Sequence, residues 1–148
     1  MRAFIGAGIE PGKLGIGINL HGYLWTGQDS EDVSAPGRTW KVPPRVVELT
    51  YGEVMKEYFD ANRYRWDEEA EVPYISSPRT NQFLSYEDSR GVAAKLHYVQ
   101  LKGLGGIIIW EIGSDEQNPT AKRRLLGMIE KATNGYAVPR SNERAGEK

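Results

Sequence analysis

The run GLGGIIIWEIGSD, residues 103–115, constrains the fold more than any other stretch of the chain. Its three consecutive isoleucines predict a β-strand that is apolar on both faces, and such strands belong to sheets that are covered on both sides. The strand also needs a hydrogen-bonded neighbour at each edge. It ends in Trp110 and Glu111, and Asp115 follows shortly after. A large aromatic side chain and two acids at the end of a buried strand are typical of a core element that ends at a binding or catalytic site.

A helix is predicted before this strand and another after it. Apolar residues recur at helical spacing through 88–102, and Gly103 is suited to end the first helix. The second helix is predicted to begin with Asn118 as its cap and Pro119 in its first turn, and to end at Asn134. This part of the chain is therefore of the α/β type.

The N-terminal part has a different pattern. Apolar residues alternate with small or polar ones from Leu14 to Leu20, which predicts a single strand within 13–25 that ends near Gly22. Turn-forming residues fill 26–38, which is predicted to be a loop. A short strand interrupted by two prolines is expected within 38–49, and proline is tolerated mainly in strands at a sheet edge.

An α+β segment follows. Thr50 and Glu53 have the spacing of a capping box, and a helix is predicted from there to Phe59. Three short β-like runs then come one after another, separated by polar turns, and predict an antiparallel meander. These runs are residues 63–67, 71–76 and 82–87.

Composition excludes several classes of function. The 148 residues include 19 basic and 20 acidic side chains, so no nucleic-acid or membrane partner is expected. The chain has no cysteine, and His21 and His97 lie far apart, so neither a disulfide nor a zinc site is predicted. No run of 18 apolar residues is present, and no cofactor-binding motif is found. Four Trp and eight Tyr beside three Phe suit either cores or sugar-like ligands.

Three stretches together resemble glycoside hydrolase family 18, the chitinases. GIEPGKLGIGINLHGYLW (8–25) is similar to the family's seventh barrel strand, and YRWDEEAEVPYI (64–75) to a run of its insertion domain. The stretch from Phe83 to Asp115 is similar to the family's closing segment, which ends with a Trp on the eighth strand. The resemblance covers roughly residues 5–132, and the order and spacing of the three stretches make it specific.

The resemblance implies an α/β fold, a (β/α)₈ TIM barrel with a small antiparallel α+β insertion between strands 7 and 8. Residues 1–25 and 88–135 are then expected to be the C-terminal part of the barrel, containing its last two strands. Residues 26–87 are expected to be the chitinase insertion domain, and 136–148 a solvated tail. A whole barrel takes about 250 residues, so the chain is expected to be a C-terminal part of a larger enzyme.

The family's catalytic residues have no counterpart in this sequence. In the family, a glutamate within the run Asp-x-x-Asp-x-Asp-x-Glu is the general acid, and the N-acetyl carbonyl of the substrate is the nucleophile. That run is absent here. We therefore predict no catalytic residue, no metal and no cofactor, and a chain that by itself is catalytically silent.

The resemblance nevertheless implies substrate-binding residues. Trp110 is expected to form the floor beneath the sugar that is cleaved; without the resemblance, a plug of the barrel core would be the favoured interpretation. His21 and Tyr23 fall where the family has a Tyr and an Arg that contact sugars, and Asn19 falls on a Pro. Tyr23 therefore replaces a cation. For His21 the alternative is a histidine that is hydrogen-bonded at a strand end.

The functional hypothesis is a segment of an extracellular or cell-envelope enzyme that hydrolyses β-1,4-linked N-acetylglucosamine polymers. Its expected partners are a chitin-like oligosaccharide and the N-terminal barrel part of the parent enzyme. A homodimer that forms through exposed strands is a further hypothesis. One alternative is a non-catalytic oligosaccharide-binding module, similar to chitinase-like lectins. Another is a structural fragment that self-associates. The sequence leaves open whether the polysaccharide is chitin, peptidoglycan or another N-acetylglucosamine glycan.

Overall fold

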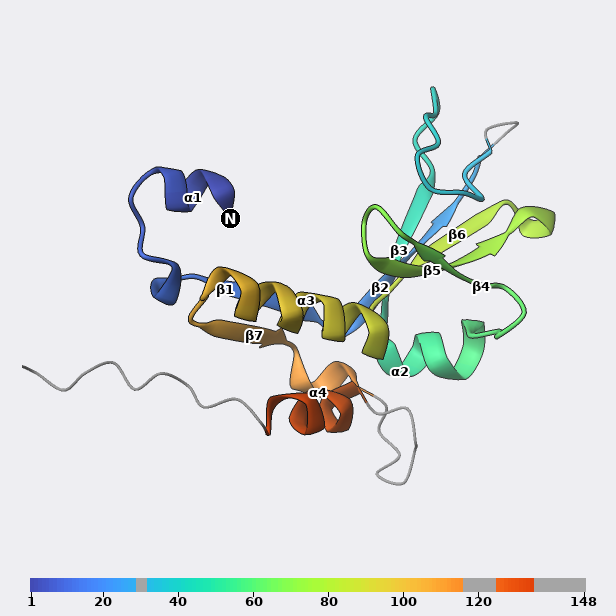
Figure 1. Ribbon diagram of the computed structural model, residues 1–148. Helices are drawn as coiled ribbons and strands as arrows, with labels where there is room; N and C mark the ends of the chain where they lie inside the picture. Colours follow the sequence, from blue (N-terminus) through green and yellow to red (C-terminus); the bar gives the residue numbers. More distant parts are fainter. Residues whose placement is uncertain (29–31, 116–124, 135–148) are drawn as a thin grey trace, which may run out of the picture.

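The computed structural model describes residues 1–28, 32–115 and 125–134 (Figure 1). The elements in chain order are α1 (Arg2–Gly6), η1 (Pro11–Lys13), β1 (Gly15–Asn19), β2 (His21–Thr26), β3 (Arg45–Thr50), α2 (Tyr51–Glu53), η2 (Val54–Tyr58), β4 (Tyr64–Asp67), β5 (Val72–Ser77), η3 (Pro78–Thr80), β6 (Gln82–Ser85), α3 (Ser89–Lys102), β7 (Gly106–Trp110), η4 (Ile112–Ser114) and α4 (Leu125–Thr133). No helix among these described residues is long and apolar enough to cross a membrane.

The described residues form two sheets. β1 and β7 pair in parallel, and the other sheet is antiparallel with the order β3-β2-β6-β5-β4. In Figure 1 the small sheet lies beneath α3, α4 is drawn below β7, and the large sheet stands at the right-hand end of α3. The helices α3 and α4 contact each other and share one buried cluster with β1, so they cover the same face of the small sheet. The core is continuous between the sheets, because Ile18, Leu24, Leu84 and Val92 belong to one buried cluster.

The strand predicted within 13–25 is in fact two strands, and the prediction of a single strand was wrong. β1 ends at Asn19 in the parallel sheet, and β2 begins at His21 in the antiparallel sheet. The residue between them, Leu20, is fully buried. Its N–H donates to Trp110 O (2.7 Å), and its carbonyl accepts from Tyr51 N–H (2.9 Å). Leu20, His21 and Gly22 are all buried, so burial does not alternate through the junction. In the sequence, however, apolar residues alternate with small or polar ones up to Leu20 with no turn signal, so the pattern does not reveal the change of sheet.

This junction also bears on the predicted domain division. By sheet membership the chain leaves the parallel sheet at Leu20, whereas the sequence placed the division after Trp25. The division into domains stays a prediction, and so does a solvated tail at 136–148, which lies outside the described residues.

The antiparallel part agrees with the sequence in most details. β4, β5 and β6 form the predicted meander, and the strand after the prolines, β3, lies at the sheet edge. The capping box is present: Glu53 N–H donates to Thr50 Oγ1 (3.2 Å), and Thr50 N–H donates to Glu53 Oε2 (2.7 Å). The helix continues as one π-helical turn through Tyr58.

The two helices predicted around β7 begin with carboxylate caps. α3 starts after Asp88, whose Oδ1 accepts from Gly91 N–H (2.9 Å), and ends at Gly103 with φ of 60°. Asp115 is 2% exposed and accepts from the N–H groups of Leu125 (3.0 Å) and Leu126 (3.1 Å). Asp115 is therefore a structural support for α4. The predicted cap at Asn118, with Pro119, lies outside the described residues.

Only one face of β7 is covered by the described residues. Ile107 and Ile109 pack against the buried cluster, whereas Ile108 is 63% exposed. Its partner on β1 is Gly17, which has no side chain with which to cover it. The face of the small sheet that carries Ile108 is therefore apolar and open to further packing, as expected for a strand whose sequence is apolar on both faces.

The structure predicts that alanine substitution destabilises the protein at one strand glycine and has little effect at another. A Cβ at Gly22 would lie 2.8 Å from Ser85 O and 2.9 Å from Tyr86 Cβ, so Gly22→Ala should lower the free energy of unfolding by about 2 kcal/mol. A Cβ at Gly17 would meet no atom within 4 Å, so Gly17→Ala should change it by less than about 0.5 kcal/mol. Urea unfolding of both variants checks this, and equal effects would contradict the packing described.

Candidate functional site

Trp110 lies at the carboxyl end of β7 and is 62% exposed. Its partner across the parallel pair is Asn19, the last residue of β1. Paired residues of neighbouring strands point to the same face, so Trp110, Asn19 and Ile108 share the open face of the small sheet. The peptide bond between Trp110 and Glu111 is cis. The exposed fraction of Trp110 shows that its indole is accessible at the strand end.

His21 and Tyr23 lie at the start of β2, on one face of the antiparallel sheet. The His21 side chain is buried, its Nε2 lies 3.5 Å from Glu48 Oε1, and its ring contacts that of Tyr23 edge-on with centroids 6.2 Å apart. Both residues line a hollow of about 190 Å³, which we call the polar hollow. Its lining residues are Asn19, His21, Tyr23, Val72, Ser85, Tyr86, Glu87 and Lys95.

The structure brings the three predicted site residues into one neighbourhood but not into one hollow. Trp110 does not line the polar hollow, whereas Asn19, its partner on β1, does. The backbone continues directly from Asn19 through Leu20 to His21. The accessible indole and the polar hollow therefore lie next to each other, at the junction of the two sheets.

Glu87 is a site residue that the sequence reasoning missed. It is 4% exposed, and Lys95 Nζ of α3 donates to its Oε2. Its Oε1 lies so close to Gly91 that a Cβ there would collide with it. Burial raises the pKa of Glu87, and the Lys95 ammonium acts in the opposite direction. The signal in the sequence was a glutamate before a helix cap, with a lysine eight positions later; this spacing alone does not indicate burial.

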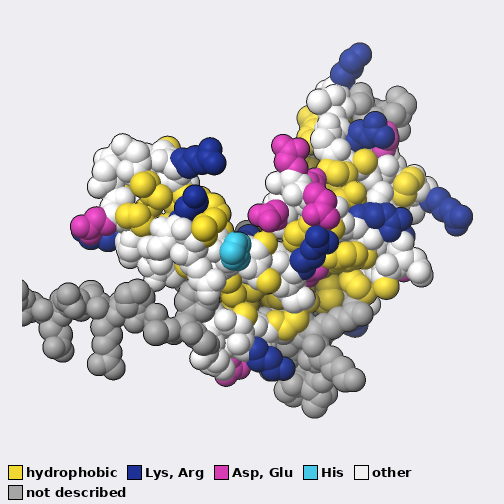
Figure 2. Space-filling view, in the orientation of Figure 1, with side chains coloured by type: hydrophobic (Ala, Val, Ile, Leu, Met, Phe, Trp, Pro, Cys, Tyr) yellow, Lys and Arg dark blue, Asp and Glu magenta, His cyan; other side chains and the backbone are white. Residues whose placement is uncertain are grey.

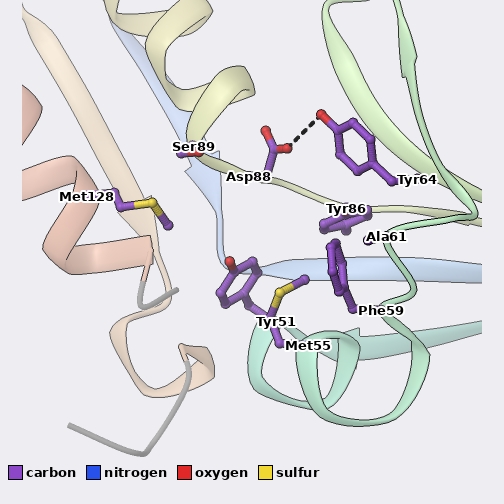
Figure 3. Close-up of a pocket in the computed structure, with 9 residues that line it drawn as sticks. All are labelled: Tyr51, Met55, Phe59, Ala61, Tyr64, Tyr86, Asp88, Ser89 and Met128. Atoms are coloured by element: carbon purple, nitrogen blue, oxygen red, sulfur yellow. Dashed lines mark hydrogen bonds between the residues drawn. The ribbon is translucent and has the colours of Figure 1, made fainter. Parts of the chain in front are cut away.

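A second, more apolar pocket lies on the other side of Tyr86 (Figure 3). Its volume is about 330 Å³, and its lining residues are Tyr51, Met55, Phe59, Ala61, Tyr64, Tyr86, Asp88, Ser89 and Met128. Tyr64 Oη donates to Asp88 Oδ2 (3.0 Å), and burial followed by the Asp88 charge raises the pKa of Tyr64. Asp88 already caps α3. This carboxylate therefore has a structural role, and none of the predicted site residues lines the pocket.

The polar hollow is suited to bind a polar, uncharged ligand. It offers the carboxamide of Asn19, the imidazole of His21, the phenol of Tyr23 and the hydroxyl of Ser85. Sugar rings combine hydroxyl groups with an apolar C–H face, and an accessible indole beside hydrogen-bonding groups matches both features. No group of three or more His, Asp and Glu side chains that could hold a metal occurs among the described residues.

Comparison with known proteins gives a consistent result. The family model of glycosyl hydrolases family 18 matches residues 1–115. The chain is 30% identical over 135 residues to chitinase A1 of Niallia circulans, and this match covers 84% of the chain and 18% of that enzyme. The resemblance inferred from the three sequence stretches is therefore confirmed.

Solved structures agree on the fold. A family 18 N-acetylglucosaminidase from Paenibacillus barengoltzii matches with a TM-score of 0.70 and 28% identity, over 88% of this chain and 36% of that one. Chitinase ChiA74 from Bacillus thuringiensis matches with a TM-score of 0.74 and 23% identity, over 90% of this chain and 25% of that one. The chain thus spans well under half the length of each protein.

The Glu87 environment predicts a specific pH dependence of stability. Because its pKa is raised in the folded chain, the folded state binds this proton more tightly than the unfolded state. The resulting stabilisation is fully present below the ordinary carboxyl range and is lost as the pH rises through the folded-state pKa. Glu87→Gln, which cannot titrate, should lack this contribution, whereas the exposed Glu69→Gln should retain it. Urea unfolding between pH 4 and 7 tests this, and parallel curves for Glu87→Gln and the wild type would refute it.

Proposed function

Because the chain belongs to glycosyl hydrolase family 18, we propose that it is part of an enzyme that hydrolyses β-1,4-linked N-acetylglucosamine polymers. The observation that carries the proposal is the accessible Trp110 at the end of β7, next to the polar hollow, in which uncharged hydrogen-bonding groups lie beside the Glu87–Lys95 ion pair. Two of the relatives are chitinases and one is an N-acetylglucosaminidase, which agrees with this class of substrate.

In this proposal β1 and β7 are the last two strands of a (β/α)₈ barrel, and the antiparallel sheet is the insertion between them. The parallel pairing of the two strands, with α3 packed against them, supports this arrangement. So does the open apolar face that carries Ile108, because the interior of a TIM barrel is filled by side chains from all its strands. The chain spans 18% of chitinase A1, so the remaining strands are expected from the N-terminal barrel part of the parent enzyme.

Trp110 is proposed to stack beneath the sugar that is cleaved. Sites of TIM barrels form at the carboxyl ends of the strands, and Trp110 occupies that end of β7. The face of an indole packs on the C–H face of a sugar ring without needing a charge. A residue that only plugged the barrel core would not require polar groups beside it, and the polar hollow supplies such groups.

His21 and Tyr23 are proposed to contact the sugars on the neighbouring side of the groove. Glu48 lies against His21 Nε2 and can hold the imidazole in one orientation. Tyr23 offers a hydroxyl and a ring face where the family has an arginine. The wall formed by the antiparallel sheet is therefore expected to recognise the glycan without the cation that the family usually places there.

The chain is proposed to contribute binding surface and not the general acid. Glu87 is buried, has its Oε2 in an ion pair with Lys95 and has its Oε1 against Gly91, so it cannot reach a glycosidic oxygen. Asp88 and Asp115 each cap a helix. An extracellular or cell-envelope location fits a polymeric substrate. A non-catalytic lectin-like module is the less favoured alternative, because chitinase A1 and the N-acetylglucosaminidase named above, with 30% and 28% identity, are enzymes by name.

The unpaired edges of β1 and β7 are proposed to bind protein. Within the described residues each strand has one hydrogen-bonded neighbour, so one edge of each remains open. The preferred occupant is the N-terminal barrel part of the parent enzyme, and a second copy of the chain is the other candidate.

A first test concerns binding. Trp110→Ala should weaken the affinity for chitotetraose by about three- to tenfold, since it removes one aromatic stacking contact. Trp40→Ala is the matched control, because Trp40 is also exposed (41%) but lies against Trp25 in the antiparallel part. Isothermal titration calorimetry measures both. Equal effects of the two substitutions would rule out a specific role for Trp110.

A second test concerns catalysis. The purified 148-residue chain should release no product from a chromogenic chitobioside, because it lacks the family's acidic run. The experiment compares product release with that of a complete family 18 enzyme at equal concentration. Turnover within about tenfold of that enzyme would overturn the assignment of the chain as a binding segment.

A further inference from the structure

Three arginines line a hollow at the end of the antiparallel sheet opposite to His21. The hollow has a volume of about 600 Å³, and we call it the arginine hollow. Strand register places it there, since Thr26 at the far end of β2 pairs with Gln82, which pairs with Ser77. The lining residues are Asp60, Arg63, Arg65, Ser76, Ser77, Pro78, Arg79 and Thr80. None of them belongs to the polar hollow beside Trp110.

The charge of the arginine hollow differs from that of the chain as a whole. Three guanidinium groups face one carboxylate, Asp60, which leaves a local excess of two positive charges, while the chain has a net charge of −1. In Figure 2, Lys and Arg side chains (dark blue) gather over the right-hand end of the molecule, where Figure 1 places the antiparallel sheet. Other Lys and Arg side chains lie elsewhere on this face, and Asp and Glu side chains lie among those on the right, so the excess of positive charge belongs to the arginine hollow and not to the whole end of the molecule.

Two of the arginines are held in place by the surrounding chain. Arg63 Nε donates to Asp60 Oδ2 (2.8 Å), and its Nη1 donates to Ser77 Oγ (2.8 Å). Arg65 Nη1 donates to the carbonyl oxygens of Asn62 (2.9 Å) and Tyr64 (2.7 Å). Each guanidinium has five N–H donors and uses two in these bonds, which leaves three for a ligand. Fixed donors lose less conformational entropy when a ligand binds.

Arg79 supplies the third guanidinium and is not tied down. It lies in η3, between β5 and the left-handed turn at Asn81 (φ of 49°). It forms no ion pair with any residue in 1–28, 32–115 or 125–134. Asp60 is shared with Arg63, and hydrogen bonds from Asn62 and Arg63 lower its pKa, so it remains ionised and offsets one of the three cations.

We propose that the arginine hollow binds an oxyanion, that is, a phosphate, sulfate or carboxylate group with at least two terminal oxygens. The planar fork of a guanidinium binds two such oxygens at once, and the strongest charge-assisted hydrogen bonds are of this kind. The uncharged N-acetylglucosamine units of the proposed substrate neutralise none of this charge. The oxyanion site is therefore separate from the proposed glycosidase function, and each of the two proposals can be tested without the other.

The test uses the full 148-residue chain and sodium phosphate as the probe. The Nε–Hε signals of Arg63, Arg65 and Arg79 should shift on titration at constant ionic strength, as followed by ¹⁵N NMR spectroscopy. Arg79→Ala should weaken binding by about two- to fivefold and Arg65→Ala/Arg79→Ala by about tenfold or more, as exposed ion pairs of this kind are individually modest. Arg38→Ala is the control, because Arg38 pairs with Asp32 outside the hollow (3.2 Å) and its loss should change nothing.

A second arm identifies the source of the oxyanion. A hyaluronan tetrasaccharide carries carboxylates on a glycan, and chitotetraose is its neutral counterpart. Tighter binding of hyaluronan than of phosphate would support the site and assign it to acidic glycans, whereas binding of phosphate alone would support a site for a free oxyanion. Shifts of similar size at arginines outside the hollow, or phosphate binding that survives the double substitution, would overturn the proposal.

Discussion

The backbone of Leu20 is the connection on which the geometry of the molecule depends. Its N–H is bonded to Trp110 in the parallel sheet, and its carbonyl is bonded to Tyr51 beside the antiparallel sheet. A buried backbone group that loses its partner costs about 1–3 kcal/mol, so this residue cannot turn without a large penalty. Since no flexible linker intervenes, the positions of Trp110 and His21 are set relative to each other by one residue.

Local signals were sufficient to predict many elements. The α3 helix, the capping box at Thr50 and the antiparallel meander each depend on side chains within a few residues of one another, and the structure contains all of them. The split at Leu20 could not be predicted in this way. The apolar alternation of the sequence runs up to Leu20 with no turn signal, and what changes there is the identity of the hydrogen-bonding partners, which is a property of the tertiary structure.

The residues of the candidate site show the same difference between local sequence signals and tertiary structure. Trp110, His21 and Tyr23 were predicted because they lie within stretches that resemble a family, and the structure brings them to one junction. The Glu87–Lys95 pair was missed, since charged residues near a helix start are usually solvated, whereas Glu87 is buried by tertiary packing that includes Gly91. The arginine hollow was missed for a related reason, because Arg63 and Arg65 lie at the start of β4 and Arg79 lies in η3, and only the pairing of β4 with β5 brings these parts of the chain together.

The buried carboxylate of Asp115 has a consequence for ligand binding. The segment from Trp110 to Asp115 is fixed at one end by the bond between Trp110 and Leu20, and at the other by the two bonds from α4 to Asp115. The backbone that presents the indole is thus preorganised, and most of its freedom is lost when the chain folds. A ligand that stacks on the ring then has to restrict little more than the side-chain torsions, so weak stacking energy can appear as measurable affinity.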